Sequence, residues 1–225
     1  MENSKFLLEK ALDILNEADF QEGQWAVGGG TVLSEIYHHR LSKDIDIFID
    51  DIQLISTLSP KINDVSSEAL YYNEGSQFVS LTYREGKVDF IASPQITKFS
   101  AKEMDFYSHH VYVEDSVEIV CKKLFYRGNF AVPRDLFDLA VVFESNRKKD
   151  LLLALNDIPD KVETFYEAIL QKLDIKKFEP YSINCVNMIL PNGKKFKNKE
   201  LVICSELLNS LNKKYKLNFH KTNGR

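Results

Sequence analysis

The stretch from Gly28 to Asp50, GGGTVLSEIYHHRLSKDIDIFID, constrains the fold more than any other part of the chain. Its glycines predict a tight turn after the short strand WAVGG, and residues 31–39 fit a helix. DIDIFI alternates as a β-strand does, which puts Asp44 and Asp46 on one face and two isoleucines on the other. Strand, glycine turn, helix and strand in this order predict a mixed α/β region that presents two carboxylates on one face of a sheet.

Hydrophobic periodicity predicts the remaining elements. Before residue 116 we expect a helix over 3–19, a helix near 51–58, a strand near 66–73, a hairpin over 77–93 and a strand at 109–114. From Ser116 the pattern becomes helical, with helices over 116–128, 133–145, 149 to about 173, and about 198–215. The change of period predicts an α/β domain over residues 1–115 and a helical region over 116–225.

A third aspartate, Asp89, lies in the strand KVDFIAS, where its apolar neighbours point the other way. Three carboxylates brought together could hold Mg²⁺ or Mn²⁺, since hard cations prefer oxygen ligands. The helix that follows the glycine turn offers free N–H groups to a phosphate. Together these features suit a metal-assisted displacement at phosphorus. The plainer interpretation is that each aspartate is an outward polar residue of a half-exposed strand.

Two motifs in this order resemble a known family. GGGTVLSEIYHHRLSKDIDIF resembles the signature of the AbiEii/AbiGii toxin-type nucleotidyltransferases, within the DNA-polymerase-beta-like superfamily. VEIVCKKLFYRGNFAVPRDLFDLAVV is similar to the family's later motif, a lysine followed by Arg-Asp-x-x-Asp-Leu. The resemblance spans roughly residues 25–145. It implies an α+β fold: a polymerase-beta-like core with a mixed twisted sheet and helices, followed by a mainly helical C-terminal half.

The resemblance also implies roles for residues of the first motif. Gly29, Gly30 and Thr31 would shape the turn that meets the nucleotide's phosphates. Asp44 and Asp46 would hold Mg²⁺, with Asp89 as the third metal-binding and catalytic carboxylate near the attacking hydroxyl. Ser42 would bind nucleotide beside the catalytic pair, on the same strand face.

In the second motif, the resemblance implies that Lys123 neutralises triphosphate charge, although its neighbour Lys122 is an alternative. Arg134 would contact the nucleotide, and Asp138 would be the functional acid. The competing interpretation is that Asp135 and Asp138 form ion pairs with Arg134, Arg127 or Lys122 and fix helix packing.

Other candidates favour structural roles. Of His38 and His39, one is expected to cap the C-terminus of the preceding helix rather than to bind metal, because adjacent residues point apart on a helix. Phe125, Tyr126 and Phe130 are expected in the core rather than in a base-stacking surface.

These features predict a Mg²⁺-dependent nucleotidyltransferase that moves NMP from an NTP to an acceptor hydroxyl. The resemblance implies a toxin that acts on the 3′ end of tRNA and is restrained by an antitoxin protein. The segment Lys194–Arg225 carries a net charge of +7 and suits an RNA backbone, although the whole chain is at −4. Alternatives are nucleotidylation of a protein hydroxyl, and a non-catalytic module that binds nucleotide or a partner.

Composition sets the remaining expectations. No apolar run approaches the roughly 20 residues that span a bilayer, and the N-terminal segment lacks the pattern of a signal peptide. The three cysteines, Cys121, Cys185 and Cys204, have no metal-binding spacing and suit a reducing compartment. We therefore expect a cytoplasmic protein without membrane contact.

Overall fold

The computed structural model describes residues 2–172 and 199–216. The chain divides into two compact units. Unit 1 comprises Met1–Ile36 and Ser42–Asp115, and unit 2 comprises Tyr37–Leu41 and Ser116–Arg225. The short segment Tyr37–Leu41 therefore packs with the helical unit, whereas the sequence-based division places it in the first domain. Residues 194–198 and 217–225 of the predicted basic tail, and Cys185, lie outside the described residues.

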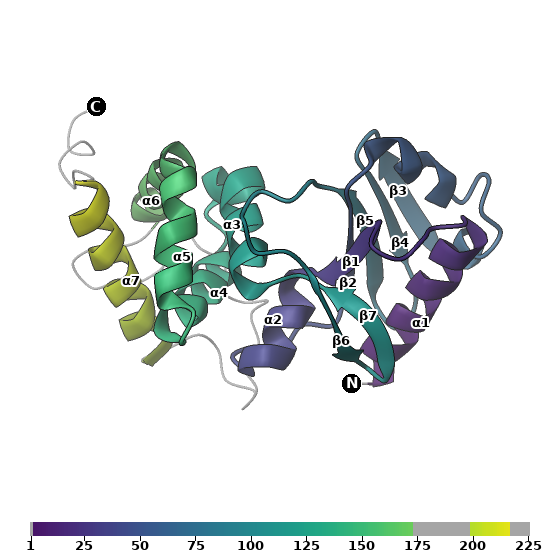
Figure 1. Cartoon of the computed structure of the whole chain (residues 1–225), viewed down its shortest axis with the longest axis horizontal. Helices are drawn as coiled ribbons and strands as arrows, with labels where there is room; N and C mark the ends of the chain where they lie inside the picture. The colour runs from purple at the N-terminus through teal and green to yellow at the C-terminus, as the bar shows by residue number, and fades with distance from the viewer. Residues whose placement is uncertain (1, 173–198, 217–225) are drawn as a thin grey trace. The chain divides into compact units, whose positions relative to one another are not determined.

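Unit 1 is built on a seven-stranded mixed sheet in the order β3-β4-β5-β2-β1-β7-β6 (Figure 1). The pairs β2–β5 and β1–β7 are parallel, and all other neighbours are antiparallel. The strands are β1 (Trp25–Gly28), β2 (Ile45–Ile49), β3 (Tyr71–Gly75), β4 (Phe78–Thr82), β5 (Lys87–Ala92), β6 (Lys102–Phe106) and β7 (His109–Val113).

The two faces of this sheet differ in burial. Inward residues alternate with half-exposed ones along β2 and β4, and the inward set is fully apolar: Ile45, Ile47, Ile49, Val79, Leu81, Val88 and Phe90. Helix α1 (Glu2–Glu17) contacts β2 and β5 and buries its own stripe of Leu7, Leu8, Ala11, Ile14 and Leu15. Because burial of one Leu or Ile contributes about 1.5–3 kcal/mol, this layer fixes the strand register. The polar side chains are left on the opposite, open face.

Shorter elements complete unit 1. Helix α2 (Gly29–Tyr37) follows β1 directly, and two 3₁₀ helices, η1 (Ile52–Leu58) and η2 (Ser66–Glu68), connect β2 to β3.

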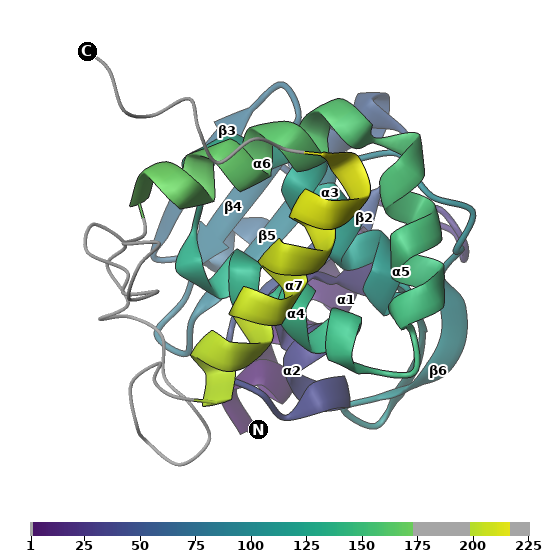
Figure 2. The same ribbon diagram turned by 90° about the vertical axis from the view of Figure 1, so that its left-hand side faces the viewer.

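Unit 2 is helical. It contains α3 (Ser116–Arg127), η3 (Gly128–Phe130), α4 (Pro133–Glu144), α5 (Lys148–Ala154), η4 (Leu155–Asp157), α6 (Pro159–Lys172) and α7 (Lys199–Tyr215). Helix α7 packs against α4 and α6 (Figure 2). Its inward residues Cys204, Leu207, Leu208 and Leu211 are fully buried.

The α+β class is confirmed: a mixed sheet with helices precedes a helical C-terminal part. The strand predicted near 66–73 corresponds to β3, but its predicted start is wrong, because η2 occupies 66–68 and β3 begins only at Tyr71. The sequence did not predict β6, whose first four residues are all exposed and so lack the alternation of a half-buried strand. The single helix expected from 149 to 173 is divided into α5, η4 and α6, and Pro159 starts the second α-helix.

Two aromatic side chains also depart from expectation. Tyr126 is 50% exposed and Phe130 is 62% exposed, so neither belongs to the core. Tyr126 lies near the end of α3 and Phe130 in η3.

Candidate active site

The glycine turn places the start of α2 directly against the Asp46 carboxylate. Gly29 has φ +72°, a left-handed conformation that favours glycine. A Cβ at this position would overlap the side chain of Asp46, so a larger residue would displace the carboxylate. Thr31, in the first turn of α2, donates its hydroxyl hydrogen bond to the backbone carbonyl of Asp44. These contacts tie the helix start to the beginning of β2, and free N–H groups at such a start attract anions.

Asp46 and Asp89 lie side by side on the open face of the sheet. They are direct register partners across the parallel pair β2–β5. Partners in register share a face, and neighbouring strands lie about 4.8 Å apart. Both residues are partly exposed, while the residues on either side of each are buried. Two carboxylates thus meet on an accessible surface although they are 43 positions apart in the sequence.

Asp44 and Ser42 lie before β2 and not in it. The Asp44 Oδ1 atom accepts a hydrogen bond from the backbone N–H of Lys87 at 3.1 Å. Across residues 2–172 and 199–216, no group of three or more His, Cys, Asp or Glu side chains is placed to hold a metal ion. The predicted strand is thus shorter than expected at its start: it begins at Ile45, one residue after Asp44.

Sequence reasoning did not consider Glu114, a carboxylate at the same turn. Its backbone N–H donates to the carbonyl of Val27 at 2.8 Å, and its side chain is 5% exposed. A Cβ on Gly28 would collide with Glu114 and with Phe48, so this glycine is also required for close packing. A lone glutamate directly after a strand gave no signal in the sequence.

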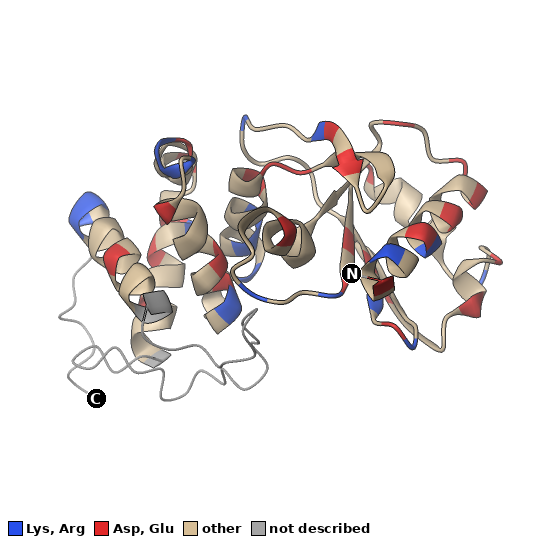
Figure 3. Cartoon of the chain, turned by 90° about the horizontal axis from the view of Figure 1, so that it is seen from below, with Lys and Arg blue, Asp and Glu red and all other residues tan. Residues whose placement is uncertain are grey.

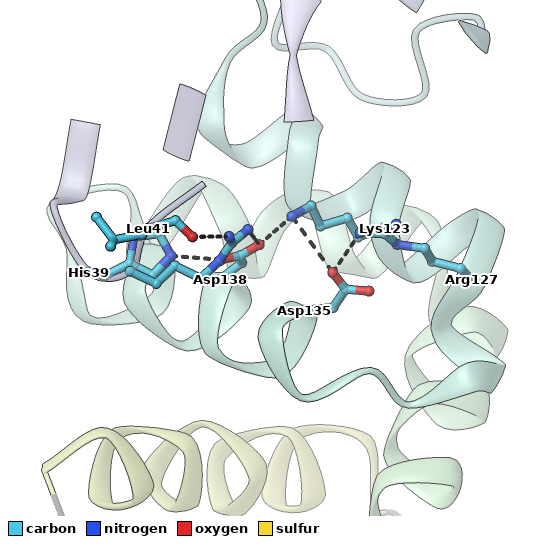
Figure 4. Close-up of polar contacts among 7 residues, drawn as sticks. His39, Leu41, Lys123, Arg127, Asp135 and Asp138 are labelled. Atoms are coloured by element: carbon cyan, nitrogen blue, oxygen red, sulfur yellow. Dashed lines mark hydrogen bonds and ion pairs between the residues drawn. The ribbon is translucent and has the colours of Figure 1, made fainter. Parts of the chain in front are cut away.

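The second motif forms a buried polar cluster in unit 2 (Figure 4). Asp138 is 0% exposed and accepts hydrogen bonds from three side chains. Arg40 contributes Nε at 2.6 Å and Nη2 at 2.8 Å, a two-point contact with both carboxylate oxygens. His39 Nε2 lies 2.6 Å from Oδ1, and the Lys123 ammonium binds Oδ2. Such charge-assisted bonds are about twice as strong as neutral ones.

Charge and burial oppose each other at this cluster. Burial would by itself raise the pKa of Asp138, but the charges of Lys123 and Arg40 and the hydrogen bonds from Arg40 and His39 hold that pKa well below its usual range. Burial lowers the pKa of His39 despite its contact with Asp138. Asp138 is thus held as an anion between the Arg40 and Lys123 cations.

Lys123, and not Lys122, faces the aspartates of the motif. Its Nζ lies 3.7 Å from Asp135 as well as against Asp138. Lys122 lies 3.7 Å from Glu118, one turn earlier on the same helix. Asp135 also pairs with Arg127 at 2.7 Å. The pair of Asp135 with Arg127 is one that the competing interpretation named, whereas Asp138 pairs with Arg40, His39 and Lys123 instead.

Two residues of the first motif, His39 and Arg40, belong to unit 2 and contact Asp138 of the second motif. Helix α2 ends at Tyr37, and the next residue, His38, has φ +49°, so neither histidine lies on the helix. His39 and Arg40 instead turn into the cluster around Asp138. The sequence signal was their place inside the first motif, directly after the helix. Arg134, the other predicted nucleotide contact, is exposed in the first turn of α4.

Charged residues of both signs lie on the described helices of unit 2 (Figure 3), and the last turn of α7 carries Lys213 and Lys214.

None of the helices in the described ranges combines the length and the apolar character needed to cross a membrane.

Comparison with known proteins gives the class. The family described as "Nucleotidyl transferase AbiEii toxin, Type IV TA system" matches residues 11–184, which is more than half of the chain. The protein therefore belongs to the AbiEii toxin family of nucleotidyltransferases, and a type IV toxin–antitoxin family implies an antitoxin partner. A search of curated proteins gave no match.

Among solved structures, the chain is similar to an H. pylori protein described as a "putative nucleotidyltransferase". The sequence identity is 16%, 97% of each chain is covered, and the TM-score is 0.47.

Proposed function

We propose that this toxin-type nucleotidyltransferase moves a nucleoside monophosphate from an NTP to the 3′ hydroxyl of a tRNA. The observation that carries the proposal is the register pairing of Asp46 with Asp89 beside the Gly29 turn. It provides two accessible carboxylates next to a helix start that can receive phosphate. Family membership supports the transfer, and the RNA acceptor follows from the resemblance of the two motifs.

The carboxylates of Asp46 and Asp89 suit a divalent cation. Mg²⁺ is commonly held by one or two carboxylates together with substrate phosphates and water, so Asp46 and Asp89 suffice as protein ligands. When bound, Mg²⁺ or Mn²⁺ would neutralise charge on the phosphates and polarise the reacting centre.

The residues of the chain would perform the remaining tasks. The N–H groups at the start of α2, shaped by Gly29, Gly30 and Thr31, would orient the phosphates of the NTP. Asp89 would accept the proton of the acceptor hydroxyl as its oxygen attacks the α-phosphorus. A new P–O bond forms to the acceptor, the bond between the α-phosphorus and the bridging oxygen breaks, and pyrophosphate leaves. Orientation and charge neutralisation supply most of the rate gain in such transfers.

The resemblance implies that Lys123 and Arg134 of the second motif contact the nucleotide. Lys123 is buried against Asp138 and Asp135, whereas Arg134 is exposed. Asp138 is fully buried behind its partners, so we assign it a positioning role: it holds Lys123 and Arg40 in place. Direct participation of Asp138 in the chemistry would require that buried cluster to open.

The experiment that tests this proposal follows a label on the α-phosphate of the NTP. The protein is incubated with each NTP labelled at the α-phosphate, Mg²⁺ or Mn²⁺, and total tRNA together with a protein extract. We expect labelled tRNA from at least one NTP, and no label when the same NTP carries it at the γ-phosphate. Chelation of the metal should abolish labelling. Label in protein alone would assign a protein hydroxyl as acceptor, and absence of label from both polymers would overturn the proposed transfer.

A further inference from the structure

The open face of the unit 1 sheet continues past the two aspartates towards strand β3. Ser80 of β4 is the register partner of Asp89, and Asn73 of β3 is the partner of Ser80. On the other side, Gly28 of β1 pairs with Asp46. These five positions form one row across five strands, because register partners share a face.

A second row runs beside the first across β5, β4 and β3. Lys87 pairs with Thr82, and Thr82 pairs with Tyr71. Each of the three lies two residues along its strand from a member of the first row, so all three are on the open face. Tyr71 is 75% exposed. The face therefore offers an ammonium group, hydroxyls, an amide and an aromatic ring next to Asp89.

We infer that Ser80, Asn73, Thr82, Tyr71 and Lys87, here called the β4–β3 platform, bind the last few nucleotides of the RNA acceptor. This inference rests on the proposed function and goes beyond it by placing the acceptor strand. Single-stranded RNA is recognised by bases stacked on aromatic rings, by hydrogen bonds to base edges and 2′-hydroxyls, and by cations at phosphates. The platform supplies each of these groups.

The order of the strands indicates from which side the RNA acceptor approaches Asp89. The Gly29 turn, where the NTP phosphates are proposed to bind, lies at the β1 end of the first row, and β3 lies at the other end. An acceptor that reaches Asp89 from the side away from the NTP must cross β4 and β3. Strand spacing and rise put Tyr71 about 12 Å from Asp89. That distance corresponds to about three stacked nucleotides.

RNA is favoured over a protein on this face by the chemistry of the side chains. A protein segment that extended the sheet would pair with the backbone of the edge strand β3 and would depend little on one ring. A stacked base depends on that ring directly. Tyr72, the next residue on β3, provides the comparison, because its register partner Leu81 belongs to the buried face.

The experiment compares Tyr71→Ala with Tyr72→Ala and Tyr71→Phe in the full chain. Transfer to total tRNA is measured as KM for tRNA and KM for the NTP, and binding of fluorescent tRNA is measured without nucleotide. We expect Tyr71→Ala to raise the tRNA KM and weaken tRNA binding about tenfold, with the NTP KM unchanged. Tyr71→Phe keeps the ring and should stay within about twofold of the parent, as should Tyr72→Ala.

A charge pair gives a second, independent measurement. Lys87→Gln should lower the slope of log affinity for tRNA against log salt by about 0.7, the value for one phosphate contact of a single strand. Lys102→Gln, an exposed lysine on the opposite edge strand β6, should leave the slope unchanged.

Equal effects of Tyr71→Ala and Tyr72→Ala, or no effect of either, would overturn the platform while leaving the transferase proposal intact. Transfer to protein alone would overturn it as well. If the parent protein labels no polymer, the proposed function fails, and the tRNA binding measurements then decide the platform by themselves.

Discussion

Two pairs of aspartates, one in each unit, show opposite ways of using a carboxylate. Asp46 and Asp89 are partly exposed on an open sheet face, and strand register holds them in place. Asp135 and Asp138 are 3% and 0% exposed, and cations surround them. A carboxylate that is to receive a cation or a proton from substrate must keep accessible oxygens. One that is buried and fully coordinated by the protein can fix the positions of its partners instead.

The first prediction tests whether the exposed pair, Asp46 and Asp89, takes part in nucleotide transfer. Asp46→Asn and Asp89→Asn should each lower the rate of nucleotide transfer about 10³- to 10⁴-fold, because each removes an anion from the reacting centre. Asp50→Asn, an exposed aspartate directly after β2, should keep the parent rate. The measurement is single-turnover transfer of α-labelled NTP, with circular dichroism to establish folding. Full activity in either folded variant would remove this pair from the mechanism.

The second prediction concerns the buried pair. Asp138→Asn should lower the free energy of unfolding by about 3 kcal/mol or more, because it leaves Arg40 and Lys123 without their shared anion in a buried site. Asp150→Asn, which removes an exposed ion pair with Arg147, should cost about 1 kcal/mol or less. Urea unfolding gives both values. A variant at Asp138 that is as stable as the parent but inactive would make Asp138 a catalytic residue, against the role proposed above.

The third prediction sharpens the part played by backbone geometry at the exposed pair. Gly29 and Gly23 both have positive φ, +72° and +82°, but a Cβ at Gly23 meets nothing within 4 Å. Gly23→Ala should therefore cost only conformational strain, about 1 kcal/mol, with transfer retained. Gly29→Ala should cost about 2–3 kcal/mol and should also reduce transfer, because its methyl group displaces the Asp46 carboxylate. Similar activity in the two variants would show that the close approach of Gly29 to Asp46 is unimportant.

The sequence predicts the exposed pair better than the buried one, for a physical reason. Alternation within DIDIFI and KVDFIAS is local, so it correctly assigns Asp46 and Asp89 to the polar face of a sheet. It could not show that they are register partners, because that depends on the parallel pairing of β2 with β5. Nor could it show that the regular strand starts at Ile45 and leaves Asp44 bonded to the backbone of Lys87.

The buried cluster depends on a contact between residues about 100 positions apart. The local sequence around His39 and Arg40 predicts the end of a helix. In the structure the positive φ of His38 follows the helix, and the next two residues contact Asp138. Periodicity carries no information on such a contact. The resemblance did single out Lys123, as a contact to the triphosphate, and Asp138, as the functional acid, but it could not reveal their burial.

The smallest predicted effect concerns pH and separates the two histidines whose pKa values move in opposite directions. Burial lowers the pKa of His39, and its Nδ1 has no hydrogen-bond partner within the part of the chain that is described. The unfolded chain therefore binds a proton at this position more readily than the folded one. The free energy of unfolding should therefore fall as the pH is lowered below 6.5, by at most about 1.4 kcal/mol per pH unit, and it should recover above that value.

His39→Gln retains an amide donor for Asp138 but cannot titrate, so it should remove this slope below pH 6.5. His110→Gln is the control. Hydrogen bonds to Asp105 and Glu103 raise the pKa of the exposed His110, so its contribution to stability is present at low pH and is lost as the pH rises. The control should leave the fall below pH 6.5 in place. Urea unfolding at several pH values tests both variants, and an unchanged slope in His39→Gln would mean that the imidazole is already charged beside Asp138.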